Sequence, residues 1–292
     1  MSSTHRTPTP STPAPSTPSS PSSPSSPSSP SSPSSPSSPS HPPADGTAVR
    51  RLLVRGMLAG LGAGVFALLV AFFLGEPGVE DAIAFEEAGA HEHGAELVSR
   101  TAQSTGGLAT GVLAFGVAFG GIAALVCCFA LGRAGRFAPR TTALLVSGAA
   151  LLCVYLVPFL KYPANPPAVG DPGTIGKRTA LYFLMMLLGV VLAVAAVLCG
   201  RRLVPRLGTW YATVAAGAFF VLAVGLACAF LPAVDEVPEG FPADLLWRFR
   251  VAALAIQLTF WTAFGLLFGE AAQRLLSPGA RGAPGDPSPA VR

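Results

Sequence analysis

Long apolar stretches alternate with short polar ones from residue 53 to residue 269 of this 292-residue chain. A helix needs about 20 mostly apolar residues to cross a hydrocarbon layer of roughly 30 Å, because lipid satisfies no backbone amide. Six stretches reach about that length: 53–74, 106–131, 141–160, 180–200, 209–231 and 250–269. The pattern predicts an all-α polytopic transmembrane helix bundle with about six spans.

Only the residues RRLVPRLG separate the fourth stretch from the fifth. So short a connection predicts a tight hairpin between two antiparallel helices. An even number of spans also places both chain termini on the same side of the membrane.

The composition supports a membrane protein, because 51% of the residues are hydrophobic and 12% are charged, against about 25% charged in soluble domains. The N-terminal part differs, with an SSP triplet that repeats from Ser19 to about Ser38 and no signal-peptide-like apolar stretch before Leu52. Such a segment cannot bury enough surface to fold. We therefore expect a disordered Pro/Ser-rich tail at 1–48, a transmembrane domain at 49–275 and a short flexible C-terminal tail at 276–292.

The charges indicate an orientation. Thirteen of the 19 basic residues flank the spans on one side, and twelve of the 15 acidic residues lie on the other. Because Lys and Arg concentrate in cytoplasmic loops, we expect a multi-pass protein of the cell membrane with both termini in the cytoplasm. The net charge of +4 does not indicate nucleic-acid binding, since no continuous basic patch is present.

Small residues predict close helix packing. The first stretch carries Gly56, Gly60 and Gly64, and the second carries Gly107, Gly111, Gly116 and Gly120. Glycine at such spacing lets two helix backbones approach, either each other or a partner subunit. The five cysteines all lie in apolar stretches without CxxC spacing, which is typical of soft core residues and not of a metal site or disulfide framework.

The first outer connection, GEPGVEDAIAFEEAGAHEHGAELVSRTAQST, is the candidate metal-binding segment. Imidazole and carboxylate together suit a divalent transition metal, and the candidate ligands are Glu86, Glu87, His91, Glu92, His93 and Glu96. In a helix Glu87 and His91 would share a face, whereas His91 and His93 would do so only in an extended segment. A solvated acidic surface loop is the alternative interpretation. The spacing is not the HExxH of zinc hydrolases.

The second and third outer connections are rich in proline and aromatic residues, and we expect Pro158 and Pro232 to terminate their spans. Each of these connections leads into the next helix through arginine, at Arg178 and at Arg248 and Arg250. Such arginines either pair with the carboxylates of the outer loops or extend to lipid headgroups. Trp247 lies beside Arg248, and tryptophan is common at the membrane interface. Extension of Arg248 and Arg250 to lipid headgroups is therefore supported as well as pairing with carboxylates.

The sequence lacks a phosphate loop, a nucleophile elbow and any acidic residue in the middle of a span. We therefore expect neither an enzyme nor a permanently bound cofactor, and any ATP-driven step would need another chain.

Three stretches resemble the CbtA-type family of predicted cobalt transporter subunits: EPGVEDAIAFEEA at 76–88, VPFLKYPANPPAVGDPGTIGKRTALYF at 157–183 and LPAVDEVPEGFPADLLWRFR at 231–250. The resemblance covers about residues 50–275. It implies cobalt uptake as the function and a small single-span CbtB-like subunit as a partner. The family-like positions in the last two stretches are Tyr162, Pro163, Asn165, Pro166, Pro167, Asp171, Arg178, Glu236, Glu239, Asp244, Trp247, Arg248 and Arg250.

The resulting hypothesis is a membrane subunit of a cobalt or other divalent transition-metal transporter, with the acidic and histidine-bearing loop capturing the ion. The alternative is a non-transporting membrane scaffold or sensor that binds a partner protein through its outer loops.

Overall fold

The computed structural model describes residues 46–89, 106–133, 135, 137–167 and 169–277. The chain divides into two units, Met1–Pro42 and Pro43–Arg292, and all described residues belong to the second. Most of the two predicted tails therefore lies outside the described residues.

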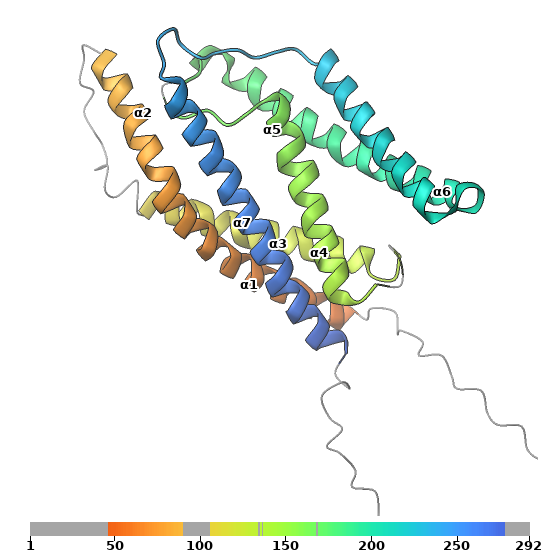
Figure 1. The fold of residues 1–292 in the computed structure, drawn as a ribbon. Helices are drawn as coiled ribbons and strands as arrows, with labels where there is room; N and C mark the ends of the chain where they lie inside the picture. Colours follow the sequence, from red (N-terminus) through yellow and green to blue (C-terminus); the bar gives the residue numbers. More distant parts are fainter. Residues whose placement is uncertain (1–45, 90–105, 134, 136, 168, 278–292) are drawn as a thin grey trace, which may run out of the picture. The chain divides into compact units, whose positions relative to one another are not determined.

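All regular secondary structure in the described residues is helical. The elements are α1 (Gly46–Val70), the π-helical turn η1 (Ala71–Gly75), α2 (Glu76–Gly89), α3 (Leu108–Ala130), α4 (Pro139–Ala150), the π-helical turn η3 (Leu151–Leu156), α5 (Val157–Lys161), the 3-10 turn η4 (Pro172–Thr174), α6 (Ile175–Phe230) and α7 (Ala243–Leu276). Five helices in these residues are long and apolar enough to cross a membrane. Together they cover all six predicted stretches to within two residues at either end, so the all-α membrane-spanning fold is confirmed (Figure 1).

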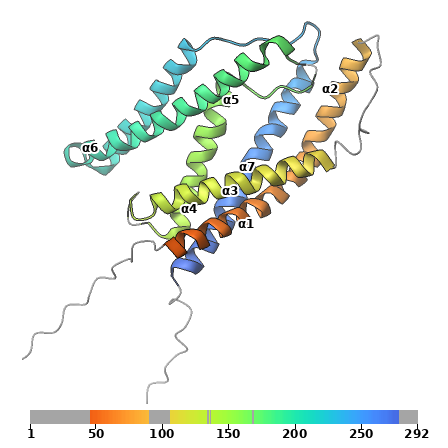
Figure 2. The same cartoon turned by 180° about the vertical axis from the view of Figure 1, so that it is seen from behind.

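The longest helix, α6, is a hairpin that accounts for two of the predicted spans. Its 56 residues contain one non-helical position, Gly208, with φ 75° and ψ 167°. This region of backbone space is essentially reserved for glycine, and Pro205 three residues earlier already disfavours a continuous helix. The two arms turn back on each other at this point (Figures 1 and 2). The predicted tight hairpin is therefore confirmed.

Two further prolines lie inside helical segments, each preceded by a π-helical turn. Pro77 follows η1 and Pro158 follows η3. A proline ring clashes with the carbonyl four residues earlier in a regular α-helix, and those residues, Phe73 and Val154, lie within the π turns. We infer that the wider π turn relieves this clash and lets the helix continue. The expectation that Pro158 ends its span is therefore wrong, since the helix runs on to Lys161; α6 does end at Phe230, just before Pro232.

Glycines of α1 and α3 form the closest helix contact. A Cβ built on Gly60 would lie 2.1 Å from the carbonyl oxygen of Gly116, and one built on Gly120 would lie 2.5 Å from that of Gly56. No side chain fits at such distances. The two helices therefore pack on each other as predicted, although a Cβ built on Gly111 would have no atom within 4 Å.

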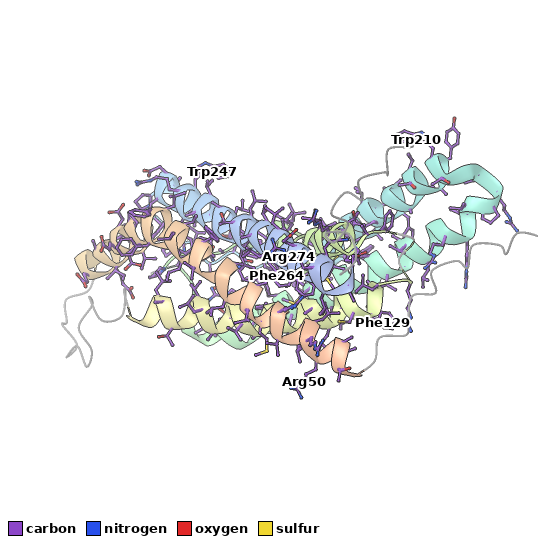
Figure 3. The ribbon with its side chains drawn as sticks, turned by 90° about the horizontal axis from the view of Figure 1, so that it is seen from below. Arg50, Phe129, Trp210, Trp247, Phe264 and Arg274 are labelled. Carbon is purple, nitrogen blue, oxygen red and sulfur yellow. The ribbon has the colours of Figure 1, made fainter. Side chains whose placement is uncertain are left out.

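The main core surrounds α7, which packs against α1 and α4. Phe264 and Phe268 are fully buried there and stack with ring centroids 5.4 Å apart. Figure 3 shows Phe264 among the helices, whereas Trp210 and Trp247 project outward and are 75% and 68% exposed. Exposed apolar side chains continue along all the long helices, as a lipid-facing surface requires.

Polar contacts join α1, α4 and α7 at one end of the bundle, where α7 ends. Arg55 of α1 donates to the carbonyl oxygen of Ala271 at 2.7 Å. Glu270 of α7 pairs with Arg140 of α4 and, at 2.5 Å, with Arg274. We call this the arginine-rich end.

Candidate functional site

The other end of the bundle contains the described part of the first connection and the second and third connections, and we call it the acidic end (residues 76–87, 162–174 and 231–248). Ala82 of α2, Val169 of the second connection, and Phe241 and Leu245 of the third form a small buried cluster. The rings of Phe85 and Phe241 meet edge to face at 5.1 Å. Helix α2 and the second and third connections therefore form one packed layer.

Glu236 is the centre of the polar contacts in this layer. Its carboxylate accepts hydrogen bonds from the Thr174 hydroxyl, from the backbone N–H of Asp171 at 3.3 Å, and from Arg178 at 2.7 Å. These contacts hold the pKa of Glu236 below its usual value. The hydrogen bond from Thr174 contributes most, and the Asp171 N–H and the charge of Arg178 add to it, whereas burial acts in the opposite direction. One ionised carboxylate thus ties the third connection to the start of α6.

The start of α6 is shaped by a local turn. The Asp171 side chain accepts a hydrogen bond from the N–H of Gly173 at 2.8 Å, as expected when Asp precedes a Pro-Gly pair. This turn directs Thr174 and the N–H of Asp171 toward Glu236. The Asp-Pro-Gly motif signals the turn in the sequence, but nothing local reveals that Glu236, more than 60 residues later, is its partner.

Arg250 makes a second link, from α7 to the second connection. Its guanidinium donates to the carbonyl oxygen of Ala164 at 3.3 Å and to Oδ1 of Asn165 at 3.1 Å. The Tyr162 hydroxyl donates to the carbonyl oxygen of Pro232 at 2.9 Å. Each link includes a hydrogen bond from a side chain to a backbone carbonyl, between positions 86 residues apart for Arg250 and 70 residues apart for Tyr162.

The expected arginine–carboxylate pairing is therefore confirmed in part. Arg178 pairs with Glu236, and the exposed Arg248 lies 3.3 Å from Asp244 and 3.8 Å from Asp81. Arg250 instead donates to neutral oxygens and has no carboxylate partner in the part of the chain that the structure describes.

Two neighbouring cavities open between these segments. The first, the polar cavity of about 430 Å³, is lined by Asp171, Thr174 and Lys177 among others. The second, the aromatic cavity of about 320 Å³, is lined chiefly by Tyr155, Phe159, Tyr162, Asn165, Tyr182 and Arg250. Both are also lined by Arg178, Asp235 and Glu236, so the Arg178–Glu236 pair lies where the two cavities meet.

The structure describes two of the six predicted metal-binding residues. Glu86 and Glu87 are exposed on the last turns of α2. His91, Glu92, His93 and Glu96 lie outside the described residues. Within residues 46–89 and the other described ranges, no group of three His, Cys, Asp or Glu side chains is placed to hold a metal ion.

Comparison with known proteins assigns the family. Residues 49–273 match the family described as probable cobalt transporter subunit (CbtA). The chain belongs to the CbtA family. No curated protein and no solved structure matches it. The CbtA match includes both cavities and every contact of the acidic end described above. The description of the family as a transporter subunit implies that its members act in the membrane with partner proteins.

Proposed function

We propose that this protein is the membrane-embedded subunit of a transporter for Co²⁺ or a related divalent transition metal, and that the segment from Glu86 to Glu96 captures the ion at the outer surface. The observation that carries the proposal is the CbtA match over residues 49–273, which includes that segment. A small single-span CbtB-like protein is the partner that we propose.

Electrostatics supports capture at the acidic end. Helix α2 exposes Glu80, Asp81, Glu86 and Glu87 on its surface, and a concentration of negative charge raises the local concentration of hydrated cations. His91 and His93 follow this helix by two and four residues. Imidazole then supplies preference for a transition metal over Ca²⁺, which favours oxygen ligands alone.

The test is uptake of radiolabelled Co²⁺ by cells that contain the chain together with its CbtB-like partner. Even residues outside the first coordination shell change metal affinity about 10–100-fold, so the His91→Ala/His93→Ala variant should raise the half-saturating Co²⁺ concentration at least about tenfold. Uptake at saturating metal should change little, because capture and not the transmembrane path is altered.

The matched control is His5→Ala/His41→Ala, which removes the two other histidines of the chain from the N-terminal tail. Uptake by this control should equal that of the unaltered protein. Equal uptake by the His91/His93 variant at limiting Co²⁺ would remove the loop from the mechanism, and no uptake by the unaltered protein would contradict transport itself.

A further inference from the structure

The aromatic cavity lies where three spans reach the acidic end. Tyr155 and Phe159 come from the last turns of the α4–α5 span, Tyr182 from the first turns of α6, and Arg250 from the second turn of α7. A position at the ends of three spans indicates the level where hydrocarbon gives way to headgroups, the depth at which tyrosine and tryptophan are enriched.

The charges that line this cavity are not all paired among the residues that the structure describes. Arg178 and Glu236 neutralise each other at 2.7 Å. Arg250 is half-buried and donates only to the neutral oxygens of Ala164 and Asn165. Asp235 forms no ion pair with any described residue. The aromatic cavity therefore has one cationic and one anionic side chain that form no ion pair with any described residue, and a partly desolvated arginine gains most from an anionic partner.

The flanks of the cavity are apolar and exposed. Leu160, next to Phe159, is 73% exposed, and Phe183, next to Tyr182, is 59% exposed. Tyr155 and Phe159 stack with ring centroids 5.4 Å apart and form one wall. A ligand with charged groups at one end and hydrocarbon at the other would fit a cavity with a charged interior and lipid-facing flanks.

We propose that the aromatic cavity binds the headgroup of a zwitterionic phospholipid, with the phosphate on Arg250 and the ammonium group on Asp235. The acyl chains then leave along Leu160 and Phe183 into the bilayer. An ethanolamine headgroup fits better than choline, because its ammonium N–H groups donate to a carboxylate whereas a trimethylammonium group cannot. An anionic lipid has no ammonium group to pair with Asp235. The carboxylate of Asp235 would then face the negatively charged phosphate, which disfavours binding.

The experiment is native mass spectrometry of the purified full chain titrated with phosphatidylethanolamine, phosphatidylcholine and phosphatidylglycerol. The unaltered protein should bind phosphatidylethanolamine most tightly. Arg250→Gln should weaken both phosphatidylethanolamine and phosphatidylglycerol about tenfold, since both lose the phosphate contact. Asp235→Asn should weaken phosphatidylethanolamine by a similar factor and leave phosphatidylglycerol equal or tighter.

Arg206→Gln in the α6 hairpin is the control, because it removes an exposed arginine that does not line the cavity. Asp235 is exposed, so Asp235→Asn tests the proposal even if Arg250→Gln fails to fold. Equal binding of the three lipids, or unchanged phosphatidylethanolamine binding by Asp235→Asn, would overturn it. Displacement of the lipid by soluble phosphoethanolamine at comparable concentration would also overturn it, because the ligand would then be a free zwitterion.

Discussion

The side chain of Glu236 makes several polar contacts that hold the second and third connections together. Its side chain is 10% exposed and that of its partner Arg178 is 32% exposed. A carboxylate with hydrogen bonds from a hydroxyl, a backbone N–H and a guanidinium is stabilised in its ionised form. The packing of the second and third connections should therefore depend on this one ionisation.

Acidification provides a direct test at this residue. A carboxyl group with a lowered pKa in the folded protein contributes stability that is present at neutral pH and is lost as the pH falls through the folded-state value, below the ordinary 4.5. Glu236→Gln should therefore lower the apparent Tm at pH 7 but reduce the further loss of Tm between pH 5 and pH 3. Thermal unfolding in detergent at a series of pH values measures both effects.

Glu239→Gln is the control, because Glu239 is an exposed carboxylate of the same connection outside the Glu236 contacts. Its Tm profile should follow that of the unaltered protein. A Glu236→Gln profile with the same acid dependence as the unaltered protein would show that the link does not depend on the charge of Glu236.

At the scale of elements, α1 and α3 are held by backbone contact rather than by large side chains. A methyl group on Gly60 would meet the carbonyl of Gly116, and the backbone cannot rotate away as a flexible side chain would. Overpacking usually costs about 1–3 kcal/mol. Gly60→Ala should therefore lower the Tm in detergent, whereas Gly111→Ala, which enters open space, should leave it unchanged or slightly raised. Equal Tm values for the two variants would contradict the close contact.

The sequence predicted the elements better than their connections. Apolar length located all six spans because that requirement belongs to each segment alone. It did not predict that α2 continues for 14 residues beyond η1, because Pro77 normally argues against a helix and π turns carry no recognisable sequence signal. The Arg178–Glu236 pair was among several pairings that charge allowed, and only the folded arrangement of two distant connections selects it.

For the whole molecule, the decisive property is the separation of charge between its two ends. The acidic end collects the carboxylates of three connections, and the arginine-rich end is fixed by Arg55, Arg140 and Arg274. Since basic residues are retained on the cytoplasmic side during insertion, the arginine-rich end and both termini should face the cytoplasm. Capture of Co²⁺ from outside the cell requires this orientation, because Glu86 and Glu87 lie in α2 at the acidic end.

Thiol labelling tests the orientation in a variant without the five native cysteines, all of which lie in helices and are free. Glu239→Cys places an exposed thiol at the acidic end, and Ser277→Cys places one just after α7, beside the arginine-rich end. A membrane-impermeant maleimide should label Glu239→Cys in intact cells and Ser277→Cys only after permeabilisation. The reverse pattern would place the carboxylates inside the cell, where they could serve export but not capture from outside.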